Sequence, residues 1–284
     1  VDLGPGGGDA GGRVVAAGGG RRIGVEALSL PVYGDALRGA GLATEAMALD
    51  SRGADPTGLH ADAALLTPAH QFPTGVVLAP DRRRAFAEAA RSGLLVVEDD
   101  YDGEFRYDRE PVGALQALAP DDVVYAGTAS KTLAPALRLG WVVLPARLVE
   151  AFAAATDGPP PSIDQLALAA LLASGGYDAH VRRMRTVYRR RRDRLLAALA
   201  SAPVRVEGVA AGLHALVRLP AGVDEEAVVA AAADRGLALE GLRQYRVPGA
   251  PAPGPGLVVG YATPPAHRFD EAVDVLAQVL RRTT

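Results

Sequence analysis

The sequence predicts an α/β protein in which a large domain with a mainly parallel sheet is followed by a small α+β domain. Apolar runs at 94–99, 123–128 and 139–145 have no polar alternation, which is typical of strands buried on both faces. A helical stretch that begins at Pro80 precedes the first of them. Residues 202–284 return to short strands and amphipathic helices, which indicates the second domain.

The elements of the first 67 residues are predicted from the same kinds of pattern. Residues 1–22 are rich in glycine and have no apolar period, so we expect a disordered segment and the start of order near Ile23. The pattern then predicts a helix over 35–40 and a short strand over 43–48. A short apolar run at 63–67 predicts a buried strand.

Domain boundaries follow from breaks in these patterns. Residues 23–158 form the expected large domain, which ends at the Pro-rich run 158–161. A connecting helical tract over 159–200 follows, and the small C-terminal domain occupies 201–284. No internal repeat at solenoid periods is present in the sequence.

Composition excludes several classes of function. The chain has 284 residues, 49% hydrophobic and 22% charged, which is ordinary for a globular protein. A net charge of −3 gives no indication of nucleic-acid binding. Without cysteine, disulfides and Cys-ligated zinc are excluded, and we predict no metal site. No run is long enough for a membrane span and no signal-peptide pattern is present, so we expect a cytoplasmic protein without a membrane partner.

Lys131 is the strongest candidate for chemistry, because it is the only lysine among 30 basic residues. Arginine stays protonated, whereas a desolvated lysine amine is a nucleophile. The lysine follows the apolar strand 123–128, and ligands of open α/β sheets bind beyond the carboxyl ends of strands. The alternative is a chance surface lysine.

Polar residues at neighbouring strand ends support the same site. A carboxylate at a buried strand end is costly unless it is paired, and an aspartate of the acidic cluster 98–102 placed beneath a pyridine ring would pair with the ring N–H⁺. Thr128 and Ser130 offer hydroxyl groups near the lysine, and Arg138 offers bidentate contacts to a phosphate.

Other polar features are interpreted without a role in chemistry. Asp102 and Glu104 are taken as capping or solvated acids. The arginine-rich tract 182–194 is either a nucleic-acid contact or the solvated face of a helix, and we favour the helix face. Its inward side chains would be Met184, Val187 and Leu195.

Several segments closely resemble the aminotransferase-like domain of MocR-type regulators of the GntR superfamily. They are TPAHQFPTG (67–75), VEDDYDGEF (97–105), VGALQAL (112–118) and VVYAGTASKTLAPALRLGWVVLP (123–145). Residues 162–199, 211–220 and 257–262 are similar to the same family, so the resemblance extends from about residue 23 to the C-terminus.

The resemblance implies a fold-type-I domain, aminotransferase-like, that binds pyridoxal 5′-phosphate (PLP). By motif position, Lys131 would form the internal aldimine, Asp99 would pair with the pyridine nitrogen and Tyr101 would bond the phenolic oxygen. The phosphate would be held by Ser130, Arg138 and Thr128, with His70 and Phe72 near the ring. Arg243 and Arg246 are candidates for holding a substrate carboxylate.

The sequence also departs from the family. Where the family reads roughly VEDPGYPG, residues 25–32 read VEALSLPV, so Leu30 takes the place of the aromatic that stacks on the ring. Loss of that stacking would weaken cofactor binding by about 0.5–1.5 kcal/mol. The family's winged helix-turn-helix and first stretch of the large domain are not in this sequence, so we expect an incomplete large domain or a site finished by a partner subunit.

The leading hypothesis is the PLP-binding effector domain of a MocR-type regulator, which senses an amino-acid-like or amine ligand by aldimine exchange at Lys131. This chain alone is expected to bind no DNA, and by resemblance it is expected to be a homodimer. The alternative is a free-standing aminotransferase, in which Lys131 is also the general base of the 1,3-proton shift. A third possibility is a remnant that binds nothing.

Overall fold

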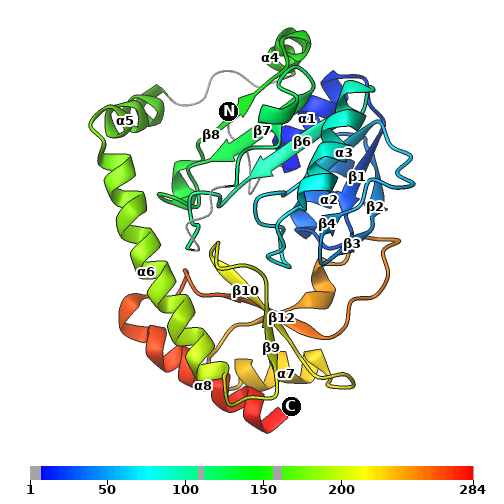
Figure 1. The fold of residues 1–284 in the computed structure, drawn as a ribbon. Helices are drawn as coiled ribbons and strands as arrows, with labels where there is room; N and C mark the ends of the chain where they lie inside the picture. The colour runs from blue at the N-terminus through cyan, green and yellow to red at the C-terminus, as the bar shows by residue number, and fades with distance from the viewer. Residues whose placement is uncertain (1–7, 108–111, 156–161, 284) are drawn as a thin grey trace.

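A large and a small sheet organise the chain, and a long helix runs beside both of them (Figure 1). The computed structural model describes residues 8–107, 112–155 and 162–283. No helix in these ranges is both long and apolar enough to cross a membrane.

The large sheet has six strands in the order β2-β1-β5-β6-β7-β8. They are β1 (Arg22–Glu26), β2 (Ala43–Met47), β5 (Ala63–Leu66), β6 (Leu95–Asp100), β7 (Val123–Thr128) and β8 (Gly140–Val143). All neighbours pair in parallel except β7 and β8, which are antiparallel. The expectation of a mainly parallel sheet is therefore confirmed.

Helices cover both faces of the large sheet. On one face lie α1 (Gly8–Ala17), α2 (Pro31–Gly39) and α4 (Val149–Ala154), which share a buried cluster with β1, β5, β6 and β7. On the other face lie α3 (Pro80–Arg91) and the 3-10 helix η1 (Gln116–Leu118). Proline at the first position starts α2 and α3 without losing a helical hydrogen bond.

The expectation of disorder over residues 1–22 is wrong for residues 8–22. Helix α1 occupies part of this segment, and its Val14 and Val15 side chains are fully buried against the sheet. Small residues let the helix approach α2 closely, because Gly12 packs on Leu37 and Ala40. Burial of the valine pair therefore outweighs the low helix propensity of glycine. Residues 1–7 lie outside the described residues.

Strand β8 also corrects an expectation. The apolar run 139–145 was expected to be buried on both faces, yet Trp141 and Val143 are 37% and 47% exposed. Because β8 is the edge strand of the described sheet, it has a neighbour on one side only. An apolar sequence therefore does not by itself make a strand central.

The tract between the sheets consists of α5 (Ser162–Ala173) and α6 (Gly176–Leu199). The predicted break at 158–161 lies outside the described residues. In α6, Leu195 is buried, Met184 and Val187 are half-buried, and most of the arginines face solvent. The interpretation of the arginine tract as a solvated helix face agrees with this burial.

The small sheet is antiparallel, with the order β11-β12-β10-β9. Its strands are β9 (Arg205–Glu207), β10 (His214–Arg218), β11 (Glu240–Gly241) and β12 (Gly256–Gly260). Helices α7 (Glu225–Ala233) and α8 (Phe269–Thr283) contact each other beside it (Figure 1). The short elements are β3 (Leu49–Asp50), β4 (Gly53–Ala54), η2 (Pro135–Leu137), η3 (Ala146–Leu148), η4 (Leu242–Tyr245) and η5 (Ala266–Arg268).

Candidate cofactor site

Most of the predicted cofactor ligands lie at the ends of three adjacent strands of the large sheet or in the loops that follow them. In the register, Leu66 of β5 lies beside Glu98 of β6, and Asp99 of β6 lies beside Ala126 of β7. The loops that follow these parallel strands therefore leave the sheet at one edge. The sequence analysis predicted the site at that edge, because ligands of open α/β sheets bind beyond the carboxyl ends of the strands.

Pleating of β6 separates its acidic side chains. Glu98 accepts hydrogen bonds from the backbone N–H groups of residues 115–116, and Asp100 accepts one from the hydroxyl of Tyr125. Burial raises the pKa of Glu98 to about 7. Because side chains alternate along a strand, Asp99 points to the opposite face from these two acids.

Asp99 is buried and accepts a hydrogen bond from the hydroxyl of Tyr33. Glu26 is a second buried carboxyl group near it. Burial raises the pKa of Glu26 to about 7, although hydrogen bonds from Thr67 and Gln71 oppose the shift; the charge of Asp99 adds to it. Glu26 therefore holds a proton up to about pH 7.

Tyr101 and His70 are in direct contact. The Tyr101 hydroxyl donates to the backbone oxygen of His70 at 2.9 Å. Burial raises the pKa of Tyr101 well above its usual value, so the phenol stays a hydrogen-bond donor. Nδ1 of His70 lies 2.9 Å from Oδ2 of Asp102, which is 2% exposed. The interpretation of Asp102 as a solvated or capping acid is therefore wrong.

His214 is a site residue that the sequence analysis missed. It begins β10 of the small domain, and its ring centroid lies 4.8 Å from that of Phe72 and 5.0 Å from that of His70. Burial lowers the pKa of His214 to about 3, so the ring is neutral. The signal was its place in the segment 211–220, which supported the resemblance but was given no role.

Lys131 stands in the turn after β7 and is exposed. Burial is the main cause of the lowered His214 pKa, and the positive charge of Lys131 adds a minor part. Beside it, the Ser130 N–H donates to Oγ1 of Thr128 at 3.1 Å. Arg138 is exposed and has a left-handed backbone with φ 52°. Of the three predicted phosphate ligands, Thr128 and Ser130 are half-buried and Arg138 is exposed.

The two candidate arginines have different surroundings. Arg246 lines a cavity of about 220 Å³ together with Leu30 and Tyr245. The backbone of Arg243 instead donates to Glu225 within the small domain at 3.0 Å. Both side chains are exposed, but only Arg246 lies next to the residue that takes the place of the stacking aromatic.

His70, Asp102 and His214 also have metal-ligand chemistry, because their ligand atoms lie within 4.8 Å of one another. His70 and Asp102 are already hydrogen-bonded to each other, and the backbone of Gly212 covers both. A Cβ atom at Gly212 would overlap both side chains. This packing leaves little room for an ion, so the group is a hydrogen-bonded contact between the two domains.

The donor set fits pyridoxal phosphate. A buried carboxylate on the site face suits a pyridine N–H⁺, a neutral phenol suits the phenolic oxygen, and an accessible amine suits the aldehyde. The hydroxyl groups of Thr128 and Ser130 and the guanidinium group of Arg138 suit the phosphate. Leu30 is half-buried and packs with the cores of both sheets. Because it is a leucine, it has no aromatic ring to stack on the cofactor.

The fold and donor set together define a PLP-binding protein of the aminotransferase type. The pattern of the family "Aminotransferase class I and II" matches residues 4–276, and the chain belongs to this family. LysN, an α-aminoadipate aminotransferase from Thermus thermophilus solved with N-(5′-phosphopyridoxyl)-L-leucine, superposes with a TM-score of 0.84. The two sequences are 25% identical, and the superposition covers 98% of this chain and 76% of the LysN chain.

Two curated relatives are transcriptional regulators. The pyridoxine biosynthesis regulator PdxR of Corynebacterium glutamicum is 34% identical over 91% of this chain and 57% of its own length. The probable rhizopine catabolism regulatory protein MocR of Rhizobium meliloti is 32% identical over 69% of this chain and 41% of its own. The chain thus spans about half the length of these regulators, and the resemblance to MocR-type proteins is confirmed.

Proposed function

We propose that the chain is the ligand-sensing part of a MocR-type transcriptional regulator, in which an amine or amino acid competes with Lys131 for bound pyridoxal phosphate. The observation that carries the proposal is the junction between the two sheets, which lies directly on the candidate site. Similarity to PdxR and MocR supports it. In this proposal another part of the whole regulator contacts DNA.

The first contact of the junction is made by Gly212. Its N–H donates to the backbone oxygen of Phe105 at 2.8 Å, and its φ of +73° suits glycine. Its backbone covers the His70–Asp102 pair, and the backbone oxygen of His70 in turn accepts the Tyr101 hydroxyl. A ligand that shifts Tyr101 or His70 therefore pushes on the small domain.

The second contact joins residues 27–29 to residues 245–247. Ser29 N–H donates to the Tyr245 oxygen at 2.8 Å, and Val247 N–H donates to the Ala27 oxygen at 3.0 Å. Arg246 lies between these bonds. A ligand carboxylate held by Arg246 would bind to this seam and favour one arrangement of the two domains, which is the requirement for a sensor.

Each residue has a specific task in this proposal. Pyridoxal phosphate, when bound, supplies an aldehyde and an electron-withdrawing ring. Lys131 would hold the aldehyde carbon through Nζ, and Asp99 would accept the ring N–H. The Tyr101 hydroxyl, which donates to the backbone oxygen of His70, would turn to donate to the phenolic oxygen. Thr128, Ser130 and Arg138 would hold the phosphate, and His70 and Phe72 would pack beside the ring. The neutral His214 would keep a second positive charge away from Lys131.

Absorption spectroscopy tests the proposal. The chain is titrated with pyridoxal phosphate, and we expect a visible band of lysine-bound cofactor that is absent from Lys131→Ala. Amines and amino acids are then added together with an oxo acid. A change of the band without amino-group transfer supports the sensor. No band, or a band that survives in Lys131→Ala, contradicts it.

The second candidate is a free-standing aminotransferase. The superposition on LysN favours it, since the described fold is shared with an active enzyme. In that case Lys131 would also be the general base that carries a proton from the α-carbon of the amino acid to the carbon supplied by the cofactor's aldehyde. Catalytic turnover of the amino acid and oxo acid pair in the same experiment would select the enzyme.

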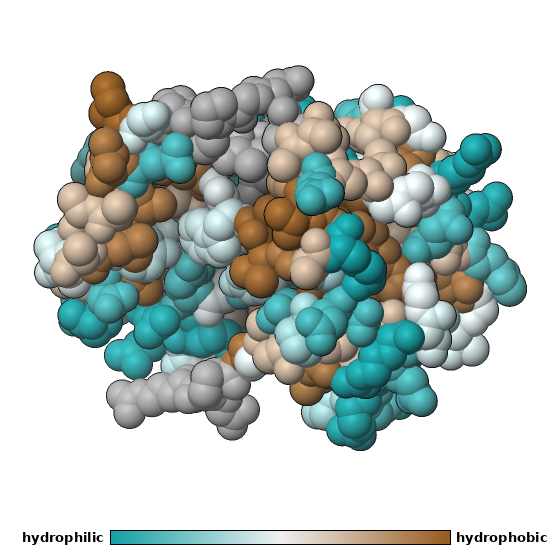
Figure 2. Space-filling view, turned by 90° about the horizontal axis from the view of Figure 1, so that it is seen from above, coloured by the Kyte–Doolittle hydropathy of each residue, from teal (hydrophilic) through white to brown (hydrophobic). Residues whose placement is uncertain are grey.

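We further propose that the chain acts as a homodimer through α5. No described side chain of this helix is buried, and Ile163 and Leu166 are 81% and 70% exposed. Figure 2 shows hydrophobic atoms gathered at the end of the molecule where α5 lies. Apolar residues gathered on one exposed helix are typical of an interface.

A further inference from the structure

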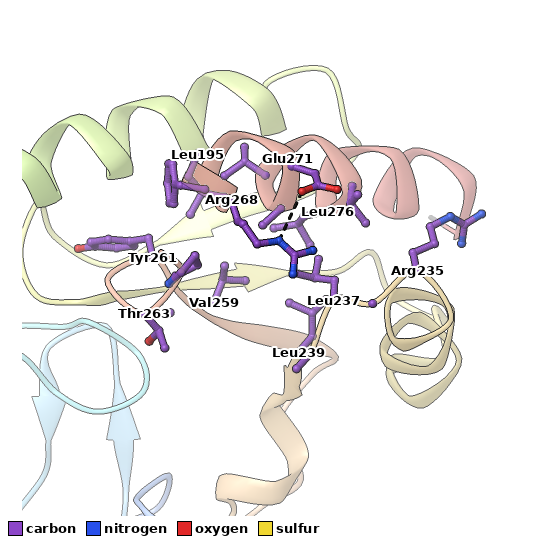
Figure 3. Close-up of a pocket in the computed structure, with 18 of the residues that line it drawn as sticks. Leu195, Arg235, Leu237, Leu239, Val259, Tyr261, Thr263, Arg268, Glu271 and Leu276 are labelled. Carbon is purple, nitrogen blue, oxygen red and sulfur yellow. Dashed lines mark ion pairs between the residues drawn. The ribbon is translucent and has the colours of Figure 1, made fainter. Parts of the chain in front are cut away.

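A second cavity, of about 500 Å³, lies in the small domain (Figure 3). It is formed by the segment 236–240, strand β12, the turn after β12 and helix α8, and none of the predicted cofactor ligands lines it. Its walls are mainly apolar. The apolar residues that line it include Leu237, Leu239, Val259, Phe269, Val273 and Leu276.

Four charged residues line the cavity, namely Arg235, Glu240, Arg268 and Glu271. Glu240 accepts a hydrogen bond from the Tyr245 hydroxyl. Figure 3 shows the Arg268 guanidinium between α8 and the wall formed by Leu237 and Val259. Its ion pair with Glu271 is long, at 3.5 Å, and both side chains are more than 60% exposed, at 62% and 66%. Such a pair contributes little to stability, so a better-placed carboxylate can replace it. Arg235 points away from the cavity and donates to the Ala231 oxygen.

We propose that this cavity binds a small amphipathic carboxylate, whose apolar body fills the cavity and whose carboxylate pairs with Arg268. Ligand pockets are typically about 300–1,000 Å³ in volume, apolar, with a few polar groups that fix orientation. The cavity has this size and this distribution of groups. Binding here does not depend on the proposed function.

Tyr261 connects the cavity to the candidate cofactor site. It lines the cavity, and its hydroxyl donates to the backbone oxygens of Gly212 at 2.6 Å and Ala211 at 2.9 Å. Gly212 covers the ring of His70. An occupant that displaces Tyr261 therefore changes the position of the backbone against His70, so the second ligand alters the affinity for the first. This coupling rests on the proposed function.

Isothermal titration of the chain with decanoate, without added cofactor, tests the cavity. We expect saturable binding that Arg268→Gln weakens about tenfold, because a charge-assisted contact is lost. Ala272→Phe, which fills the cavity from a half-buried position on α8, should abolish it. Arg282→Gln, on the same helix outside the cavity, should leave it unchanged. No binding, or binding that both Arg268→Gln and Ala272→Phe leave intact, overturns the site.

Titration with pyridoxal phosphate, with and without saturating decanoate, tests the coupling. We expect decanoate to change the cofactor affinity about fivefold or more, the lower range for coupled sites. Tyr261→Phe should keep decanoate binding and lose the change. Equal cofactor affinities in the wild type overturn the coupling but leave the cavity site standing. If the wild type binds no cofactor, the proposed function and the coupling both fail, while the decanoate titration still decides the cavity.

Discussion

The hydroxyl of Tyr33 donates a hydrogen bond to Oδ2 of Asp99, and both groups are buried. Tyr33 belongs to α2 and Asp99 to β6, so a helix on one face of the sheet orients the carboxylate at the end of a strand. A carboxylate accepts about four hydrogen bonds, so this contact leaves capacity for a ring N–H. Tyr33 is therefore a positioning residue for Asp99.

Tyr33→Phe should lower the free energy of unfolding by about 1–3 kcal/mol, because a buried acceptor loses its donor. It should also weaken cofactor binding, since Asp99 loses its fixed orientation. Urea denaturation and the cofactor titration measure the two effects. Tyr125→Phe is the matched control, because Tyr125 donates to Asp100 on the other face and is only half-buried. A smaller effect of Tyr33→Phe than of Tyr125→Phe on both measures is incompatible with this role.

The stability of the chain should fall as pH rises from about 4.5 to 7. Burial raises the pKa of Glu26 from 4.5 to about 7, so over this range the folded chain holds a proton that the unfolded chain has released. The loss is at most about 3 kcal/mol for this group, and it levels off above the folded pKa. Glu98 adds a fall of the same sign. His214 opposes it below about pH 6.5, because burial lowers its folded pKa to about 3 and only the unfolded chain is protonated there.

Denaturation midpoints across this pH range measure the fall. Glu26→Gln should reduce its slope, because an amide does not titrate. Glu150→Gln, which alters an exposed glutamate of α4, should leave the slope as it is in the wild type. An unchanged slope in Glu26→Gln would show that Glu26 does not hold the proton.

Gly212→Ala should destabilise the chain by about 3 kcal/mol or more, because the new Cβ overlaps His70 and Asp102. Gly222→Ala is the control: its φ of +87° is as unfavourable for alanine, but nothing lies within 4 Å. That strain alone costs about 1–2 kcal/mol. Equal losses in the two variants would mean that the junction does not pack tightly on His70.

Leu166→Asp should shift a dimer toward monomer, because it places a charge on the exposed apolar surface of α5. Light scattering after size-exclusion chromatography gives the mass. Leu118→Asp on η1, at a residue that is 42% exposed, should keep the wild-type mass. A monomeric wild type, or a dimer that tolerates Leu166→Asp, rejects α5 as the interface.

Arg246→Gln should weaken the spectral response to an amino acid about tenfold but leave the response to a simple amine, because only the amino acid has a carboxylate. Arg243→Gln is the matched control. The titration of the visible band with each ligand measures both responses. A larger effect of Arg243→Gln would place the carboxylate elsewhere in the small domain.

Residues near Lys131 show how far sequence reasoning reached. Period-2 alternation distinguishes Asp99 from Glu98 and Asp100 only once a strand register exists, so the sequence could name Asp99 through the family motif alone. Asp102 was assigned to solvent, yet it is buried against His70, because that contact joins residues 32 positions apart. His214 and Tyr33 were missed for the same reason, since neither lies near Lys131 in the sequence.

Local chemistry determined much by itself: apolar runs marked the strands, and the motifs marked the family and its cofactor. The solitary lysine predicted the reactive amine. These signals are carried within short stretches of chain, where side-chain periodicity and residue type suffice.

Only the tertiary structure decided that α1 is ordered, that β8 is an edge strand, and that Tyr33 orients Asp99. It also decided that Gly212 seats the small domain on His70. Each of these depends on which surfaces meet after folding, and burial between distant segments is not encoded in any one of them.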